Sequence, residues 1–233
     1  YEAHILRDLF MGLTIHDAKA EVEPGAAESW TISPDGKVYT FKLRAGATWS
    51  DGSPVTANDF VFSWQRICDP ATAAEYAYML APVMNAEDVT AGKKKPDELG
   101  VKAVDDMTFE VTLNAPTPYF LEMLTHQATY PVSKANVEAK GADFVKPGNL
   151  VSNGAYTLAE FVPNDHVKAV KNPKFYDAAN VKIDVVNYIP TEDRSTAMKR
   201  FEAGELDSND DIPTEQLTDL KAKFGDQVHL GPY

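Results

Sequence analysis

The pattern of apolar and polar positions is clearest between residues 36 and 66. Val38–Leu43 alternates apolar and polar side chains, as a strand with one buried face does. Residues 51–54, Asp-Gly-Ser-Pro, have the composition of a turn. Thr56 then stands three positions before Asp59, a spacing typical of a capping box, and the apolar residues that follow include Trp64. This stretch therefore predicts a strand, a turn and a capped helix.

The rest of the pattern predicts further helices and antiparallel hairpins. We expect hairpins at 101–113, turning at Asp105-Asp106, and at 155–162 with 166–171, and single strands at 181–189 and 228–230. We expect helices at 1–10, 118–125 and 134–140, a helix capped by Thr191 that runs to Ala203, and one capped by Thr214 that runs to Phe224. The sum is a mixed α/β (α+β) chain in two lobes that meet near residue 133.

The composition and net charge of the chain bear on its core and on the partners that it could bind. The chain has 233 residues, and its 44% hydrophobic content is enough for a substantial core. Its net charge of −13 argues against nucleic acid or an anionic membrane as a partner, because both repel an acidic surface. No apolar run approaches the roughly 20 residues that span a bilayer. Cys68 has no second cysteine with which to pair, and we expect it to be a buried apolar side chain.

The sequence carries no pattern typical of an enzyme. The five histidines lack metal-ligand spacing, and we expect each to be a surface or structural residue. There is no GxSxG, GxGxxG or phosphate-loop motif, and adjacent acids such as Asp105 and Asp106 do not face each other across a cleft. We expect Trp49 and Trp64 to pack in the core. The sequence therefore favours a binding protein without catalytic activity or cofactor.

Several motifs together resemble one known family. The segment 49–66, WSDGSPVTANDFVFSWQR, closely resembles the signature of the family 5 periplasmic solute-binding proteins. These proteins are the oligopeptide, dipeptide and nickel receptors of ABC importers, and the segment is most similar to the oligopeptide receptors. Six further blocks appear in the family's order: RDLFMGL (7–13), PGAAESW (24–30), LGVKAVDDMTFEVTL (99–113), PTPYF (116–120), SNGAYTL (152–158) and FEAGELD (201–207). Collinear blocks over nearly the whole chain are far more specific than any one of them.

The resemblance implies a fold like that of type II periplasmic binding proteins. Residues 1–10 and 134–233 would form part of a discontinuous domain I, and residues 11–133 an inserted domain II. The chain would then be an N-terminal to middle fragment that lacks domain III, where the family anchors the ends of the peptide.

The resemblance also implies a function. The protein would be a monomeric periplasmic receptor, or a membrane-anchored one in a Gram-positive source, that binds short peptides and passes them to an inner-membrane ABC permease. Within the family, the ligand could instead be a dipeptide, a murein peptide, a nickel chelate or an oligosaccharide. The given piece could also be a structural lobe that binds no ligand by itself.

Five residues match ligand-facing positions of the family. Tyr76 matches a domain II tyrosine that contacts the peptide, although a packing tyrosine on a helix would read the same way. Asn209, Asp210 and Asp211 fall where the oligopeptide receptors have a Tyr-Asn-Asn run, with acids here in place of asparagines; simple solvation of an acidic loop is the alternative. Tyr233 matches another tyrosine of the cleft. These five form the predicted substrate-binding set.

Overall fold

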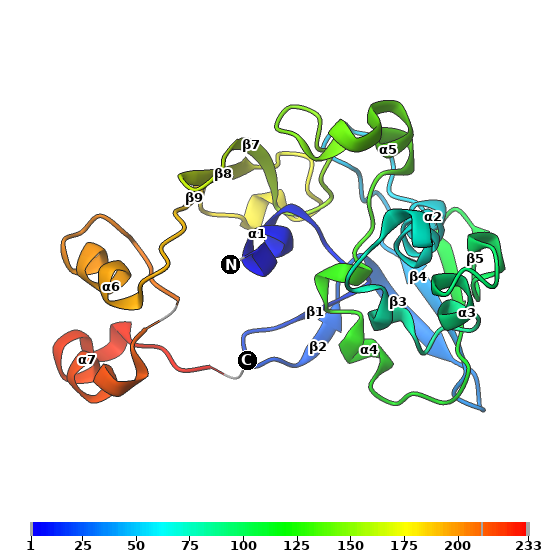
Figure 1. Cartoon of the computed structure of the whole chain (residues 1–233), viewed down its shortest axis with the longest axis horizontal. Helices are drawn as coiled ribbons and strands as arrows, with labels where there is room; N and C mark the ends of the chain where they lie inside the picture. The colour runs from blue at the N-terminus through cyan, green and yellow to red at the C-terminus, as the bar shows by residue number, and fades with distance from the viewer. Residues whose placement is uncertain (1, 211, 232–233) are drawn as a thin grey trace.

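The computed structural model describes residues 2–210 and 212–231 (Figure 1). Its strands are β1 (Thr14–His16), β2 (Val22–Pro24), β3 (Ala27–Ile32), β4 (Val38–Leu43), β5 (Val101–Asp105), β6 (Thr108–Thr112), β7 (Tyr156–Val162), β8 (His166–Lys171) and β9 (Val185–Tyr188). Its α-helices are α1 (Glu2–Leu9), α2 (Ala57–Cys68), α3 (Ala86–Thr90), α4 (Phe120–Met123), α5 (Lys134–Lys140), α6 (Arg194–Glu202) and α7 (Leu217–Phe224). The predicted mixture of helices and antiparallel hairpins is confirmed.

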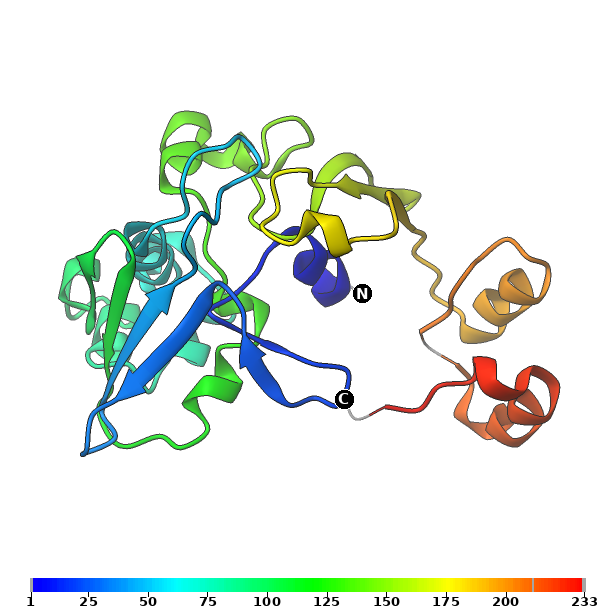
Figure 2. The same ribbon diagram turned by 180° about the vertical axis from the view of Figure 1, so that it is seen from behind.

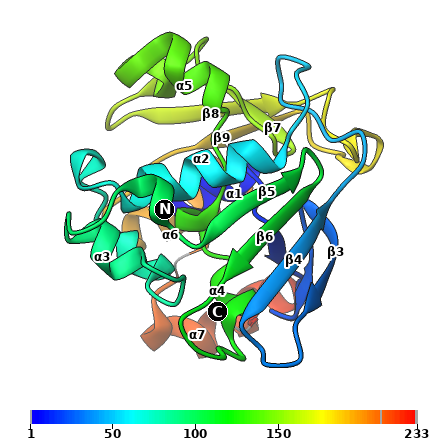
Figure 3. The ribbon, with the colours of Figure 1, turned by 90° about the vertical axis from the view of Figure 1, so that its right-hand side faces the viewer.

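The larger sheet is antiparallel, with the strand order β3-β4-β6-β5. Figure 3 shows α2 lying across one face of this sheet, where its contacts fall on β5 and β6. Trp64 of α2 meets Phe109 of β6 edge to face, with ring centroids 5.1 Å apart, and both side chains are fully buried. Burial of such large aromatic side chains is the main favourable term that holds a helix on a sheet. The prediction of Trp49 and Trp64 as core residues is confirmed.

The start of α2 is fixed by one carboxylate. Oδ2 of Asp59 accepts hydrogen bonds from the backbone N–H of Thr56, at 2.9 Å, and from Nε1 of Trp49, at 3.2 Å. Oδ1 of Asp59 accepts from the backbone N–H of Lys134, at 3.1 Å. An acid at the third position of a helix satisfies an otherwise unpaired N–H group in this way. The predicted strand at Val38–Leu43 and the helix capped at Thr56 are both confirmed.

The smaller sheet is antiparallel too, with the strand order β7-β8-β9, and α1 packs beside β7. In Figures 1 and 2, α6 and α7 lie next to each other at the end of the molecule farthest from the larger sheet. Phe201 and Phe224 join these two helices edge to face, at 5.5 Å between ring centroids. Nζ of Lys223 lies 2.7 Å from Oε1 of Glu202 and adds an ion pair to the same contact.

Side-chain and backbone hydrogen bonds connect the loop after β4 to the segment before β7. The backbone N–H of Ser50 donates to the carbonyl of Ser152 at 2.7 Å, and the N–H of Ser152 donates to Oγ of Ser50 at 3.0 Å. One continuous buried core includes Phe41 of the larger sheet and Ala169 of the smaller sheet. The two sheets therefore share apolar packing, and the segments next to them share polar contacts.

Several predicted boundaries are wrong. The helix predicted from Thr191 begins at Arg194, because the side chain of Asp193 caps it by accepting from Thr196 N–H at 2.6 Å. Thr214 starts a short 3₁₀ turn instead of capping the last helix, which begins at Leu217 after that turn. The predicted strand at 228–230 does not form, because no described strand lies beside it to share hydrogen bonds.

Candidate ligand-binding site

Tyr76 lies in a turn immediately before the 3₁₀ helix Ala77–Leu80, and 49% of its surface is exposed. Its ring packs against the rings of Tyr78 and His126, at 5.8 and 5.3 Å between centroids. We call these three rings the aromatic platform. The residue lies in a turn and not within a helix, and its ring contacts leave both readings of Tyr76, a ligand-contacting tyrosine and a packing tyrosine, as predictions. Supported rings that remain exposed can stack against apolar or planar groups of a ligand.

His126 is the member of the platform that sequence reasoning missed. It lies 50 positions after Tyr76 in the sequence, so no local pattern relates the two residues. Its Nδ1 accepts a hydrogen bond from the backbone N–H of Ala128 at 3.1 Å. Partial burial lowers the pKa of His126, and the positive charge of Arg7 lowers that pKa further. Both effects favour the neutral form of the ring.

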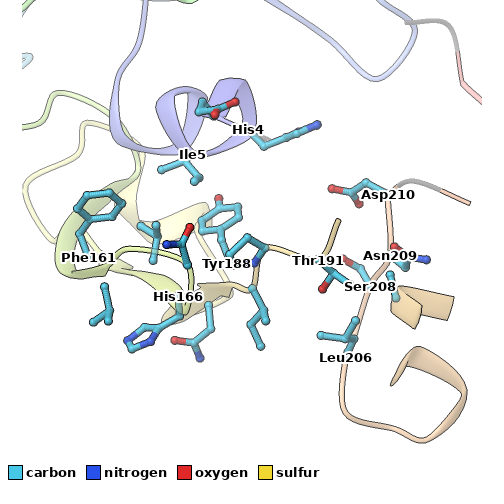
Figure 4. A pocket seen from close by; sticks show the side chains of 18 of the residues that line it. His4, Ile5, Phe161, His166, Tyr188, Thr191, Leu206, Ser208, Asn209 and Asp210 are labelled. Carbon is cyan, nitrogen blue, oxygen red and sulfur yellow. The ribbon is translucent and has the colours of Figure 1, made fainter. Parts of the chain in front are cut away.

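Asn209 and Asp210 lie together on the wall of a cavity of about 380 Å³ (Figure 4). α1 contributes His4 and Ile5 to an adjoining wall, as the close-up shows. The remaining walls come from the β7–β8 turn, the end of β9 and the loop after α6, and they include Phe161, Val162, Val167, Tyr188, Ile189 and Leu206. The exposed area of the lining is largely apolar, and polar side chains stand on several walls, His166 on one and Asn209 with Asp210 on another.

The polar groups of this wall are available to a ligand. Nδ2 of Asn209 is buried and has no hydrogen-bond partner in the described part of the chain. A buried donor without an acceptor costs about 1–3 kcal/mol, a cost that a ligand oxygen would remove. Asp210 is exposed, so its carboxylate can interact with a cation or an N–H donor.

Tyr188, which lines the cavity, forms a half-buried polar pair with Asp8 of α1. The Tyr188 hydroxyl donates to Oδ2 of Asp8, which connects β9 to α1. Burial raises the pKa of Asp8, whereas the hydrogen bond from Tyr188 and the charge of His4 act in the opposite direction. Burial also raises the pKa of Tyr188, and the adjacent Asp8 carboxylate raises it further. Tyr188 is therefore a protonated donor at neutral pH, and the pair fixes this wall of the cavity.

The structure groups the predicted residues in two places. Asn209 and Asp210 share the cavity, whereas Tyr76 belongs to the aromatic platform and does not line that cavity. α1 serves both places: its first turns line the cavity, and Arg7 acts on His126. The other two predicted residues, Asp211 and Tyr233, lie outside the described residues.

The described residues offer no candidate for a metal site, a membrane-spanning helix or a reactive thiol. Within residues 2–210 and 212–231, no group of three His, Cys, Asp or Glu side chains could hold a metal ion. In the same residues, no helix is both long and apolar enough to cross a bilayer. Cys68 is fully buried, as predicted, and burial raises the pKa of its thiol to about 11. A thiol with so high a pKa is a poor nucleophile at neutral pH.

The chain matches a known family of proteins in sequence. Residues 21–233 match the family model for bacterial extracellular solute-binding proteins, family 5 Middle. The periplasmic oligopeptide-binding protein OppA of Escherichia coli K12 is 45% identical over 235 residues, which cover 100% of this chain and 43% of the relative. The periplasmic murein peptide-binding protein MppA of the same strain is 42% identical over 99% of this chain and 43% of its own.

A solved structure agrees with these matches. The crystal structure of Haemophilus influenzae OppA in complex with RPPGFSPFR has a TM-score of 0.92 and 43% identity, covering 96% of this chain and 44% of that one. The chain thus spans less than half the length of the relatives that it matches. The match extends over both sheets and both candidate groups of residues, and the chain belongs to the bacterial extracellular solute-binding proteins of family 5.

Proposed function

We propose that this chain is part of a periplasmic substrate-binding protein that binds short oligopeptides for import by an ABC transporter. The observation that carries the proposal is the similarity to oligopeptide-binding proteins along the whole chain, in sequence and in structure. The protein binds its ligand and catalyses no reaction on it. Its partner after binding is an inner-membrane permease, and it acts as a monomer that needs no cofactor and binds no nucleic acid.

Peptide binding of this kind uses two sorts of contact. Hydrogen bonds to the peptide main chain are independent of sequence, so they give affinity without narrow specificity. Side chains of the peptide then need roomy, partly hydrated surfaces that tolerate variation. The unpartnered Nδ2 of Asn209 suits the first role, and the exposed ring of Tyr76 suits the second. Asp210 adds a negative charge for a basic side chain of the peptide, and Asp211 and Tyr233 complete the proposed set.

The proposal includes a division of the chain. Residues 11–133, with the larger sheet, form one domain, and residues 1–10 and 134–233 form part of a second. α1 and the smaller sheet lie in the second domain, and the aromatic platform lies in the first. Residues from both domains then face the ligand. Ligand binding favours a closed state only by the difference between its affinities for the closed and open states.

A murein peptide is the second candidate ligand. The murein peptide-binding relative is nearly as similar to this chain as the oligopeptide-binding one, at 42% against 45% identity. Both ligands share a peptide main chain, so the same donors would serve either. The difference would come from the side-chain surfaces and from the charge beside Asp210.

Native mass spectrometry of the full-length gene product tests the proposal. The protein is challenged with mixed peptides of two to five residues and, separately, with murein tripeptide. Adducts with the mixed peptides support an oligopeptide receptor, and adducts with murein tripeptide alone favour the second candidate. A full-length protein that retains neither ligand would refute peptide binding, and sugars and metal chelates would then be tested.

A further inference from the structure

His126 has a fixed arrangement of protons. Its Nδ1 accepts from the N–H of Ala128, and a ring nitrogen that accepts a hydrogen bond carries no proton. The single proton of the neutral ring is therefore on Nε2. Among the described residues, the hydrogen bond at Nδ1 is the only one that the His126 ring makes, which leaves Nε2 without a partner. The ring thus has one free N–H donor beside Tyr76.

Arg7 stabilises this arrangement. Among the described residues, Arg7 is the charged group that lowers the pKa of His126, and it also forms a hydrogen bond with the hydroxyl of Tyr130. That hydroxyl donates in turn to the carbonyl of Thr125, at 2.9 Å, next to His126 in the chain. Arg7 therefore contacts the turn that holds His126 and opposes a second positive charge there. Protonation of Nδ1 would break the bond from Ala128, because two N–H groups would then face each other.

We propose that His126 is a ligand-binding residue whose Nε2–H donates to an oxygen acceptor of the ligand, with Arg7 as the positioning residue that keeps this donor in place. The inference rests on the proposed function and names a contact within that site. The acceptor is a main-chain carbonyl of an extended peptide, because every peptide carries such oxygens whatever its sequence. The donor lies beside Tyr76, whose ring and that of Tyr78 are exposed. An apolar or aromatic side chain of the same peptide then stacks on these rings.

The tautomer can be measured without any ligand. The ¹⁵N shifts of the His126 side chain at neutral pH should show a protonated Nε2 and an unprotonated Nδ1. His166 is an internal reference with the opposite behaviour, since both of its ring nitrogens face carboxylates. A His126 ring with the proton on Nδ1, or with both nitrogens protonated at neutral pH, would overturn the inference.

Substitutions at His126 distinguish the contribution of its N–H donor from that of its aromatic ring. In the full-length protein, His126→Phe keeps an aromatic side chain next to Tyr76 but removes the donor, and peptide affinity should fall about 3- to 10-fold. His126→Gln keeps an N–H donor and should retain most of the affinity. His229→Phe, at an exposed histidine that is not among the ring contacts of the platform, is the matched control and should bind like the wild type.

The outcomes distinguish this inference from the function on which it rests. A His126→Phe variant that binds peptide as tightly as the wild type overturns the role of His126 and leaves the proposed function intact. A wild-type protein that binds no peptide refutes both. An equal loss of affinity in His126→Phe and His126→Gln would assign the effect to packing and would overturn the donor role.

The positioning role of Arg7 is tested by substitutions that remove or keep its positive charge. Arg7→Met should raise the pKa of His126 in an NMR titration and weaken peptide binding at mildly acidic pH, where the ring would then protonate. Arg7→Lys keeps the positive charge and should restore both values toward those of the wild type. A His126 pKa that is the same in Arg7→Met and in the wild type would remove Arg7 from this role.

Discussion

Asn153 holds the backbone of Met11 with both ends of its carboxamide. Oδ1 of Asn153 accepts from the N–H of Met11 at 3.0 Å, and Nδ2 donates to the carbonyl of Met11 at 2.9 Å. The two residues lie 142 positions apart in the sequence, and Asn153 is 7% exposed. This reciprocal pair joins the segment after α1 to the segment before β7. It therefore positions α1, which serves both the cavity and the aromatic platform.

Replacing Asn153 by leucine should destabilise the protein by about 3 kcal/mol, because two hydrogen bonds are lost and two backbone groups are left unpaired. Urea unfolding followed by tryptophan fluorescence measures the change. Asn180→Ala is the control, since its carboxamide bonds to Asp177 at the exposed surface, and it should change stability by less than about 0.5 kcal/mol. An Asn153→Leu protein as stable as the control would show that the pair contributes little.

Adding a side chain at Gly154, next to Asn153, should also destabilise the fold. A Cβ atom there would lie 2.6 Å from the carbonyl oxygen of Asp8 and 2.7 Å from the backbone nitrogen of Phe10. Backbone atoms cannot yield as the end of a side chain can, so Gly154→Ala should cost about 3 kcal/mol through overpacking. Gly231→Ala is the matched control, because a Cβ there meets nothing within 4 Å. Equal unfolding midpoints for the two variants would contradict the close approach.

The sequence predicted those elements whose signals are local. β4 and α2 were predicted correctly because the alternation of Val38–Leu43 and the Thr56–Asp59 spacing lie within a few residues of each other. The predicted start of α6 is wrong because Thr191 and Asp193 are both good capping residues, and only the backbone geometry selects Asp193. The strand at 228–230 was wrong because strand formation depends on a neighbour that the sequence pattern does not contain.

The candidate site depended on the fold more than on local pattern. Asn209 and Asp210 were named from resemblance, and their common cavity with His4 and Ile5 arises only when the loop after α6 folds back toward α1. The sequence predicts only a surface or structural role for His126, because histidine spacing tests for metal sites and not for aromatic neighbours. Its contact with Tyr76 joins two turns that are distant in sequence.

The β7–β8 hairpin should make stability depend on pH. Hydrogen bonds from His166 to Asp165 and to Glu160 raise the pKa of His166 in the folded protein. Its contribution to stability is therefore complete below the unfolded pKa of about 6.5 and is lost as the pH rises through the folded pKa. Glu160 has the opposite shift: hydrogen bonds from Lys168 and His166 lower its pKa, so its contribution is lost only as the pH falls through that lowered value.

The measurement for this hairpin is the urea midpoint at about pH 5.5 and about pH 8. Between these values the wild-type midpoint should fall by a small amount that the His166→Gln variant does not show. The effect is small because the cluster is exposed to solvent, which screens its charges. A wild-type difference no larger than that of His166→Gln would mean that the cluster does not couple to folding.

Tyr76 gives the most direct test of the platform in ligand binding. Tyr76→Ala in the full-length protein should weaken peptide binding by about 1 kcal/mol, the value of one good contact, when measured by isothermal titration calorimetry. Tyr119→Ala is the matched control, because Tyr119 is also exposed, at 63%, but no ring contact joins it to the described aromatic residues. Both variants should unfold at the wild-type urea midpoint, because neither ring is buried in the core. A Tyr76→Ala protein that is folded and binds peptide with unchanged affinity would remove Tyr76 from the site, and the platform would then be a surface feature without a ligand.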